Sequence, residues 1–467
     1  MSSKSPDLRV IEATRVAPPQ GTIAGHATLP LTFFDVLWVH LPYPFVERLF
    51  FYRYPHPTSQ FVSSLLPSLK SSLSLTLEKF YPLSGNLRLI PETDDKFEIC
   101  YIEGDSVSFT VAECNEKFED FAGYHEREVS RFQNFIPQLL KSDELQPLFA
   151  VQVTVFPDAG IAIGITVHHA ACDGTSSMQF MHEWAATCRS QTRTSSQGPL
   201  IDRNLISDPC NLYNIFHDGM LEIRKAMVAP ASSVEPTLAP ASSVEPTLAP
   251  ASSLEPMLST FTLSQEHIQK LKQLVLTDAK ERNVSFHCST IVVAIAYVVV
   301  GYFQAKRIDK STRVSFGLAA DYRSRLQPPL PIEYFGNCVG FVMADIYLSD
   351  LIRENGVALA AEAIGRDIKR LDDRLKGAEN WIELFKSFFA KPNIGTAGSP
   401  KFKVYGVDFG WGRPEKVEII SAAKTGSMAL AESRDVPGGV EIGLALPKSA
   451  MNYFKKYFEN GLEQMPV

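Results

Sequence analysis

The sequence predicts an α/β (α+β) protein built from two domains. The chain has 467 residues, which is more than one hydrophobic core usually supports. Segments with strand-like alternation and segments with helical periodicity occur in both halves of the chain. A ten-residue repeat lies between the halves, with two identical copies and a close third over 229–258. We therefore expect an N-terminal domain at 1–200, an inter-domain crossover at 201–258 and a C-terminal domain at 259–467.

The first half predicts a mixture of helices and strands. Leucines at helical spacing after Pro67 predict a helix that ends near Phe80, before the Pro82-Leu-Ser-Gly85 segment. The apolar runs 148–155 and 160–168 predict two strands joined by a tight turn, a hairpin. The remaining predictions are strands at 97–102 and 107–111, and a helix at 175–190 capped by Thr175 or Ser176.

The repeat Ala229-Pro-Ala-Ser-Ser-Val-Glu-Pro-Thr-Leu238 has two prolines in each unit and no amphipathic period. This composition predicts an exposed, largely extended linker with no catalytic role. The second half again mixes both kinds of element. Its predicted helices lie at 264–279, at 289–303 and from Ser449 onward, and its predicted strands at 314–319, 340–344 and 441–446.

Composition excludes several classes of protein. Hydrophobic residues make up 45% of the chain and the net charge is -7, values that argue against a disordered chain and against a basic nucleic-acid binder. Seven scattered cysteines without a C-x-x-C pair indicate a reducing compartment. The N-terminus lacks the apolar stretch of a secretory signal, and the apolar run 291–303 is too short to span a bilayer. We expect a cytosolic monomer without a membrane or nucleic-acid partner.

The first motif that carries chemistry is His169-Ala-Ala-Cys-Asp173-Gly174, directly after the predicted strand 160–168. A side chain in the turn after a rigid strand is both held in place and exposed. Histidine suits a general base because its ordinary pKa of about 6.5 lies near physiological pH. Only His169 has an acid four residues later, so we prefer it to His168. Cys172 leaves open an acyl-enzyme route, although buried cysteine more often packs as a small apolar group.

The second motif is Asp408-Phe-Gly-Trp-Gly412, followed by Arg413-Pro414. Gly410 and Gly412 permit backbone conformations closed to other residues, and Trp411 adds a large rigid surface. A kinase would also need an H-R-D loop and a glycine-rich loop, which are missing. The sequence has no G-x-S-x-G elbow, no Walker loop and no His/Cys set spaced for zinc, so we expect no bound metal.

Together the two motifs resemble H-x-x-x-D-G and D-F-G-W-G of the BAHD family of plant acyl-CoA-dependent acyltransferases. The resemblance implies two chloramphenicol-acetyltransferase-like domains with the site in a central solvent tunnel. It implies that His169 is the general base and that Asp173 and Gly174 hold its loop. It also implies that the 408–412 loop organises the CoA side of the channel. Asp408 is sometimes labelled catalytic in related proteins, and we expect it to form a structural ion pair.

A third segment, Tyr334-Phe-Gly-Asn-Cys338, resembles the branch that transfers malonyl groups to flavonoid and phenolic glucosides. The resemblance implies malonyl-CoA as co-substrate, no permanently bound cofactor, and a glycosylated phenolic or flavonoid acceptor. A malonyl donor carries a free carboxylate, for which Arg323 or Arg325 could supply a bidentate partner. The phosphates of CoA favour lysines and helix N-termini. The candidates for that contact are Lys270, Lys272, Ser289 and Thr290.

Three alternatives remain open from the sequence. The nearest is a hydroxycinnamoyl-CoA or acetyl-CoA transferase of the same fold. The second is a catalytically silent CoA-binding scaffold protein, and the third is a hydrolase that acts on acyl-CoA. The acceptor, the acylated position and the groups that stabilise the oxyanion are not specified by any motif in the chain.

Overall fold

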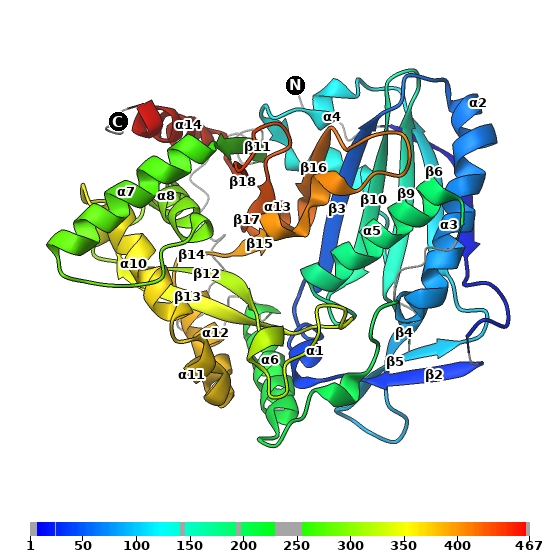
Figure 1. The fold of residues 1–467 in the computed structure, drawn as a ribbon, viewed down its shortest axis with the longest axis horizontal. Helices are drawn as coiled ribbons and strands as arrows, with labels where there is room; N and C mark the ends of the chain where they lie inside the picture. The colour runs from blue at the N-terminus through cyan, green and yellow to red at the C-terminus, as the bar shows by residue number, and fades with distance from the viewer. Residues whose placement is uncertain (1–6, 24, 141–144, 193–197, 229–254, 464–467) are drawn as a thin grey trace.

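A computed structural model describes residues 7–23, 25–140, 145–192, 198–228 and 255–463 (Figure 1). Its strands form four sheets. The six-stranded sheet has the order β1 (Leu8–Val16), β6 (Val107–Cys114), β9 (Phe149–Phe156), β10 (Gly160–His168), β3 (Phe45–Arg53) and β16 (Lys416–Ile419). The five-stranded sheet has the order β15 (Thr396–Gly398), β17 (Met428–Glu432), β18 (Val440–Pro447), β11 (Pro256–Leu263) and β7 (Arg127–Glu128).

The two other sheets are smaller. One has the order β13 (Val339–Tyr347), β12 (Arg313–Asp321) and β14 (Asn393–Ile394), and the other β2 (His26–Pro30), β5 (Phe97–Ile102), β4 (Asn86–Leu89) and β8 (Gln146–Pro147). The longer helices are α3 (Leu66–Lys79), α5 (Gly174–Ser190), α6 (Leu212–Val228), α7 (Gln265–Glu281), α8 (Thr290–Ala305), α10 (Gly356–Ile368), α12 (Trp381–Phe389) and α14 (Lys448–Glu463). The short ones are α1 (Phe33–Val36), α2 (Thr58–Gln60), α4 (Glu119–Ala122), α9 (Leu348–Leu351), α11 (Leu371–Lys376) and α13 (Ile420–Thr425).

Most of the elements predicted from the sequence are confirmed. The hairpin is β9 and β10, which pair antiparallel over their whole length. The helix after Pro67 is α3, and the two helices predicted near 264–303 are α7 and α8. The predicted cap of α5 was wrong, because Asp173 is the N-cap and its carboxylate accepts the backbone N–H of Ser176 at 3.0 Å. An aspartate is as good a cap as serine or threonine.

The crossover is more structured at both ends than its composition predicts. It contains the 17-residue helix α6, which packs against α1 and α12. The last three residues of the repeat, from Pro256, already belong to β11. Residues 229–254 of the repeat lie outside the described residues.

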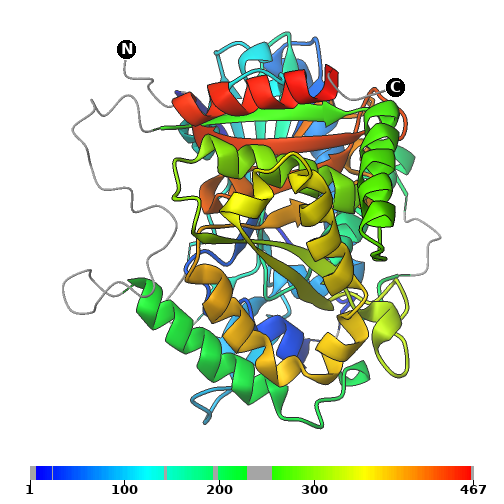
Figure 2. The same ribbon diagram turned by 90° about the vertical axis from the view of Figure 1, so that its left-hand side faces the viewer.

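The two halves of the chain exchange strands. β16, from the second half, extends the edge of the six-stranded sheet by pairing with β3, whereas β7, from the first half, pairs with β11 of the five-stranded sheet. Figure 1 shows α5 lying across the face of the six-stranded sheet, and Figure 2 shows α14 lying along β11 and β18. Neither half can therefore complete its sheet without the other.

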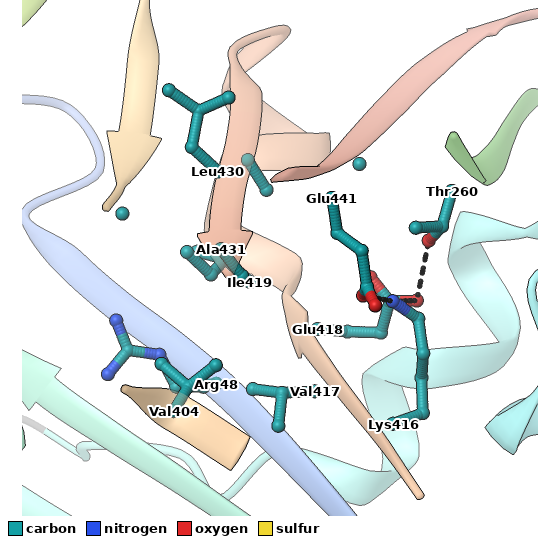
Figure 3. A pocket seen from close by; sticks show the side chains of 13 residues that line it. Arg48, Thr260, Val404, Lys416, Val417, Glu418, Ile419, Leu430, Ala431 and Glu441 are labelled. Carbon is teal, nitrogen blue, oxygen red and sulfur yellow. Dashed lines mark hydrogen bonds and ion pairs between the residues drawn. The ribbon is translucent and has the colours of Figure 1, made fainter. Parts of the chain in front are cut away.

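A buried ionic cluster joins the exchanged strands. Arg127 of β7 pairs with Glu418 of β16 at 2.7 Å, with side chains only 1% and 2% exposed. Lys416 bridges Glu418 and Glu441 of β18, at 3.6 and 3.2 Å (Figure 3). Buried charges are tolerated when each has a partner. The cluster thus holds the junction between the two halves with its charges paired.

Candidate active site

The backbone of His169 is clamped at the end of β10. Its N–H donates to the carbonyl of Pro44, which precedes β3, at 2.7 Å. Its carbonyl accepts the Nδ2 amide of Asn337 at 2.8 Å. Asn337 is itself held by Asp35, whose Oδ1 accepts both the backbone N–H and the Nδ2 of Asn337, at 3.2 and 2.9 Å. The histidine loop is therefore anchored to both halves of the chain.

The imidazole ring of His169 is also fixed. It stacks on the indole of Trp38, with ring centroids 3.5 Å apart and planes inclined by 9°. Its Nδ1 is buried and has no hydrogen-bond partner among the described residues. A neutral imidazole held in this way can act as a general base through a ring nitrogen that carries no proton.

Burial lowers the pKa of His169 below its ordinary range, although its own carbonyl, Asp173 and Asn337 act in the opposite direction. A lower pKa keeps the imidazole neutral, and so able to accept a proton, at a more acidic pH. The acidic limb of the pH profile of kcat/KM should therefore have its midpoint below about 6.5. The measurement is initial rates from pH 5 to 8 with donor and acceptor well below saturation. A midpoint above 6.5 would contradict the assigned environment of this histidine.

The carboxylate of Asp173 contacts groups other than the imidazole. It pairs with Arg323 at 2.8 Å, with side chains 1% and 3% exposed, and accepts the N–H of Cys338 at 3.1 Å. Together with the capping of α5, these contacts give each carboxylate oxygen of Asp173 a hydrogen-bond donor. The contacts agree with the bracing role that the resemblance implies.

Gly174 is required for a different reason from the one expected. Its backbone is the ordinary first turn of α5, and it is not among the residues with positive φ. A Cβ at this position would instead lie 2.7 Å from the ring of Phe402. The glycine therefore permits close packing of α5 against the segment that leads into the Asp408 loop.

The 408–412 loop is held by its own backbone. Gly410 and Gly412 have φ of +109° and +107°, which confirms that they adopt conformations unfavourable for other residues. The prediction that Asp408 forms an ion pair is wrong among the described residues. Its Oδ1 instead accepts the N–H groups of both glycines, at 2.8 and 3.0 Å. Trp411 stacks on Phe409, with planes inclined by 11°. These contacts are those of a rigid loop, and a catalytic role for Asp408 stays a prediction.

The structure gives Cys172 an environment unsuited to nucleophilic attack. Its side chain is buried, and burial raises the pKa of the thiol far above its usual range. The thiolate is the nucleophilic form of cysteine. At neutral pH the thiol stays protonated, so the contacts favour a direct transfer over an acyl-enzyme on this residue.

Some of the candidates for CoA and donor binding come together and others do not. Lys272 donates from Nζ to Oγ1 of Thr290 at 3.0 Å, beside Ser289, which caps α8. Lys270 pairs instead with Glu266 at 3.0 Å. The two arginines lie elsewhere and already have carboxylate partners, Arg323 in Asp173 and Arg325 in Asp372. Arg323, a predicted partner of the malonyl carboxylate, is therefore already paired with Asp173.

Sequence reasoning missed the supporting residues of the site. Asp35 is fully buried and also pairs with Arg203 at 3.1 Å, and Arg203 donates to the carbonyl of Ala171 inside the histidine motif at 3.0 Å. Asn337 lies in the Tyr334–Cys338 segment that resembles the family, yet no spacing rule connects Asn337 or Asp35 to His169. No periodic pattern in the sequence predicts the stacking of Trp38 on His169.

Comparisons with known proteins agree with this architecture. The model of the Transferase family matches residues 7–461. The chain is 35% identical to malonyl-coenzyme:anthocyanin 5-O-glucoside-6'''-O-malonyltransferase of Salvia splendens, over 96% of this chain and 94% of that protein. It is 34% identical to phenolic glucoside malonyltransferase 1 of Arabidopsis thaliana, over 98% of each chain. The crystal structure of vinorine synthase has the same fold, with a TM-score of 0.63 at 19% identity over 97% of this chain and 98% of that one.

None of the described helices is long and apolar enough to cross a membrane. The family model covers nearly all of the chain, and the relatives match it from end to end. The fold is the chloramphenicol-acetyltransferase-like one. This chain belongs to the Transferase family, the BAHD acyltransferases.

Proposed function

We propose that this enzyme transfers the malonyl group of malonyl-CoA to a sugar hydroxyl of a flavonoid or phenolic glucoside. One observation carries the proposal. The chain matches, over 96% and 98% of its length, relatives that are named malonyltransferases of such glucosides. The geometry of His169 supplies the chemistry that this reaction needs. Its ring stacks on Trp38 in the turn after β10, and we assign Nε2 as the nitrogen that accepts the proton.

In the proposed mechanism both substrates meet at His169 in a ternary complex. Nε2 takes the proton of the sugar hydroxyl as its oxygen attacks the thioester carbonyl. The tetrahedral oxyanion then collapses, the ester forms and the C–S bond breaks. The leaving thiolate of CoA takes the proton back from the imidazolium, which returns the neutral histidine. No acyl-enzyme is involved.

We place the phosphates of CoA near Lys272 and the N-terminus of α8. The Nζ of Lys272 lies beside Thr290, and backbone N–H groups at the start of a helix favour anions. The 408–412 loop would shape the CoA side of the channel. We further propose that the enzyme works in the cytosol, because all seven cysteines are free and suit a reducing compartment. We also propose that it works as a monomer.

A donor panel tests the proposed function. We expect the purified enzyme to use malonyl-CoA with a higher kcat/KM than acetyl-CoA or coumaroyl-CoA, measured against flavonoid and simple phenolic glucosides. A clear preference for coumaroyl-CoA would replace the proposal with the hydroxycinnamoyl alternative. Release of CoA without acceptor would indicate a hydrolase, and no turnover with any pair would indicate a non-catalytic CoA-binding protein.

A further inference from the structure

The surroundings of His169 offer no free carboxylate to balance the charge that its ring acquires in the proposed mechanism. Among the described residues, no hydrogen bond or ion pair joins an acid to the imidazole, and Nδ1 has no partner. Asp173 and Asp35 are close enough to interact with the ring electrostatically. The first is already paired with Arg323 at 2.8 Å and the second with Arg203 at 3.1 Å. In a serine-histidine-aspartate triad the aspartate orients the imidazole and stabilises the imidazolium, so this charge needs another partner here.

Trp38 covers one face of the imidazole. The two ring centroids lie 3.5 Å apart and the planes are inclined by 9°, so the rings are in face-to-face contact. Both residues are partly exposed, as a reacting group and its immediate neighbour need to be. The face of an indole carries negative electrostatic potential, and tryptophan is the aromatic side chain that binds cations best. The protonated ring of His169 would lie over that face, well inside the range of about 6 Å at which such contacts act.

The indole of Trp38 is held in place by its turn and by packing. Trp38 follows α1, and its backbone N–H donates to the carbonyl of Asp35 at 3.2 Å. Its ring packs on Phe341 of β13, with centroids 5.8 Å apart, and its Nε1 forms no hydrogen bond with any described residue. Asp35 also anchors Asn337, which holds the carbonyl of His169. One turn of the chain therefore fixes both the backbone of the histidine and the face of its ring.

We infer that Trp38 is the positioning residue of the base and that its indole stabilises the imidazolium of His169 during the transfer. The inference rests on the proposed function, in which Nε2 accepts the proton of the acceptor hydroxyl and later returns it to the leaving thiolate. Trp38 itself exchanges no proton. The contact between the rings becomes stronger when the imidazole gains its charge, so it stabilises the transition state more than the ground state. Trp38 thus does through its ring face what the aspartate of a triad does through a hydrogen bond.

The test replaces Trp38 with tryptophans that carry one, two or three fluorine atoms on the indole. Fluorine withdraws electron density from the ring face and leaves its shape nearly unchanged, so the contact with a cation weakens stepwise. The acidic limb of kcat/KM reports the pKa of His169 in the free enzyme. Because the indole favours the charged imidazole, the midpoint should move to lower pH with each fluorine, by roughly half a pH unit in total. A purely structural role of Trp38 would leave the midpoint where it is.

Two simpler variants and a matched control complete the series. Trp38→Leu removes the ring and should lower kcat about 10- to 100-fold, whereas Trp38→Phe keeps a weaker ring face and should lower kcat less. The control is the same fluorination at Trp381, whose indole stacks on the uncharged ring of Phe216 with planes inclined by 11°. Fluorinated Trp381 should leave both the midpoint and kcat unchanged.

The outcomes separate this inference from the proposed function. If His169→Ala keeps near-normal turnover, the histidine is not the base and the proposed mechanism itself fails. If His169→Ala is inactive but the fluorinated Trp38 enzymes keep the midpoint of the unchanged enzyme, only the role of Trp38 is overturned. An equal shift of the midpoint in the Trp381 series would overturn that role as well. Should Trp38→Leu fail to fold, as shown by its melting temperature, the fluorinated series decides the question.

Discussion

Replacing His169 with alanine should lower kcat by about 10³-fold while the folded protein still binds CoA. The substitution removes the imidazole that we propose takes the proton of the acceptor hydroxyl. The backbone contacts of the loop, to Pro44 and Asn337, do not involve the imidazole and should persist. Steady-state kinetics gives the loss of turnover, and calorimetry with CoA shows whether the binding site survives.

The neighbouring His168 provides the matched control. Its side chain is buried, and its Nδ1 accepts the N–H of Ala170 at 3.2 Å, which is a structural contact. His168→Asn should therefore lower the melting temperature but keep most of the turnover and the acidic limb of the pH profile. Near-normal turnover in His169→Ala, or loss of the acidic limb in His168→Asn, would contradict the assignment of His169 as the base.

Breaking the ion pair between Asp173 and Arg323 should give the largest loss of stability. Arg323→Met leaves the carboxylate of Asp173 buried without its guanidinium, which typically costs about 3–5 kcal/mol. The same guanidinium also bonds to Ser176 and to the carbonyls of Tyr334 and Gly336. Urea denaturation of Arg323→Met should therefore show a clear fall in the unfolding midpoint, accompanied by a loss of activity through the displaced histidine loop.

Two further variants show whether the ion pair itself is responsible. The double variant Asp173→Asn with Arg323→Met removes both charges and should be less destabilised than the sum of the two single variants. The exposed pair Arg53 and Glu119, at 2.5 Å with side chains 50% and 60% exposed, is the control. Arg53→Met should cost less than about 1 kcal/mol. Full additivity at Asp173 and Arg323 would mean that the two side chains act independently.

The agreement between sequence and structure is best where a local rule decides the outcome. The β9–β10 hairpin, the helices α3, α7 and α8, and the positive φ angles of Gly410 and Gly412 all follow from periodicity, turn residues or the steric freedom of glycine. Disagreements arise where several residues could satisfy the same rule. Asp173 caps α5 in place of Thr175 or Ser176, because its position at the end of the loop also lets it meet Arg323.

Charged residues were the hardest to assign from sequence. Arg323 and Arg325 stand beside a family motif and were natural candidates for the donor carboxylate, but both have protein carboxylates as partners. Arg323 pairs with a residue 150 positions away and Arg325 with one 47 positions away, and spacing along the chain does not report such contacts.

By itself the sequence determined the α/β class, the principal helices and strands, and His169 as the candidate base, because these depend on short-range periodicity and on motifs a few residues long. Only the tertiary structure decided the exchange of β7 and β16 between sheets, the stacking of Trp38 on His169, and the pairing of Arg323 with Asp173. Each of these is set by burial and by contacts between distant segments. Such contacts arise only when the two halves of the chain pack together and exclude water from the charges between them.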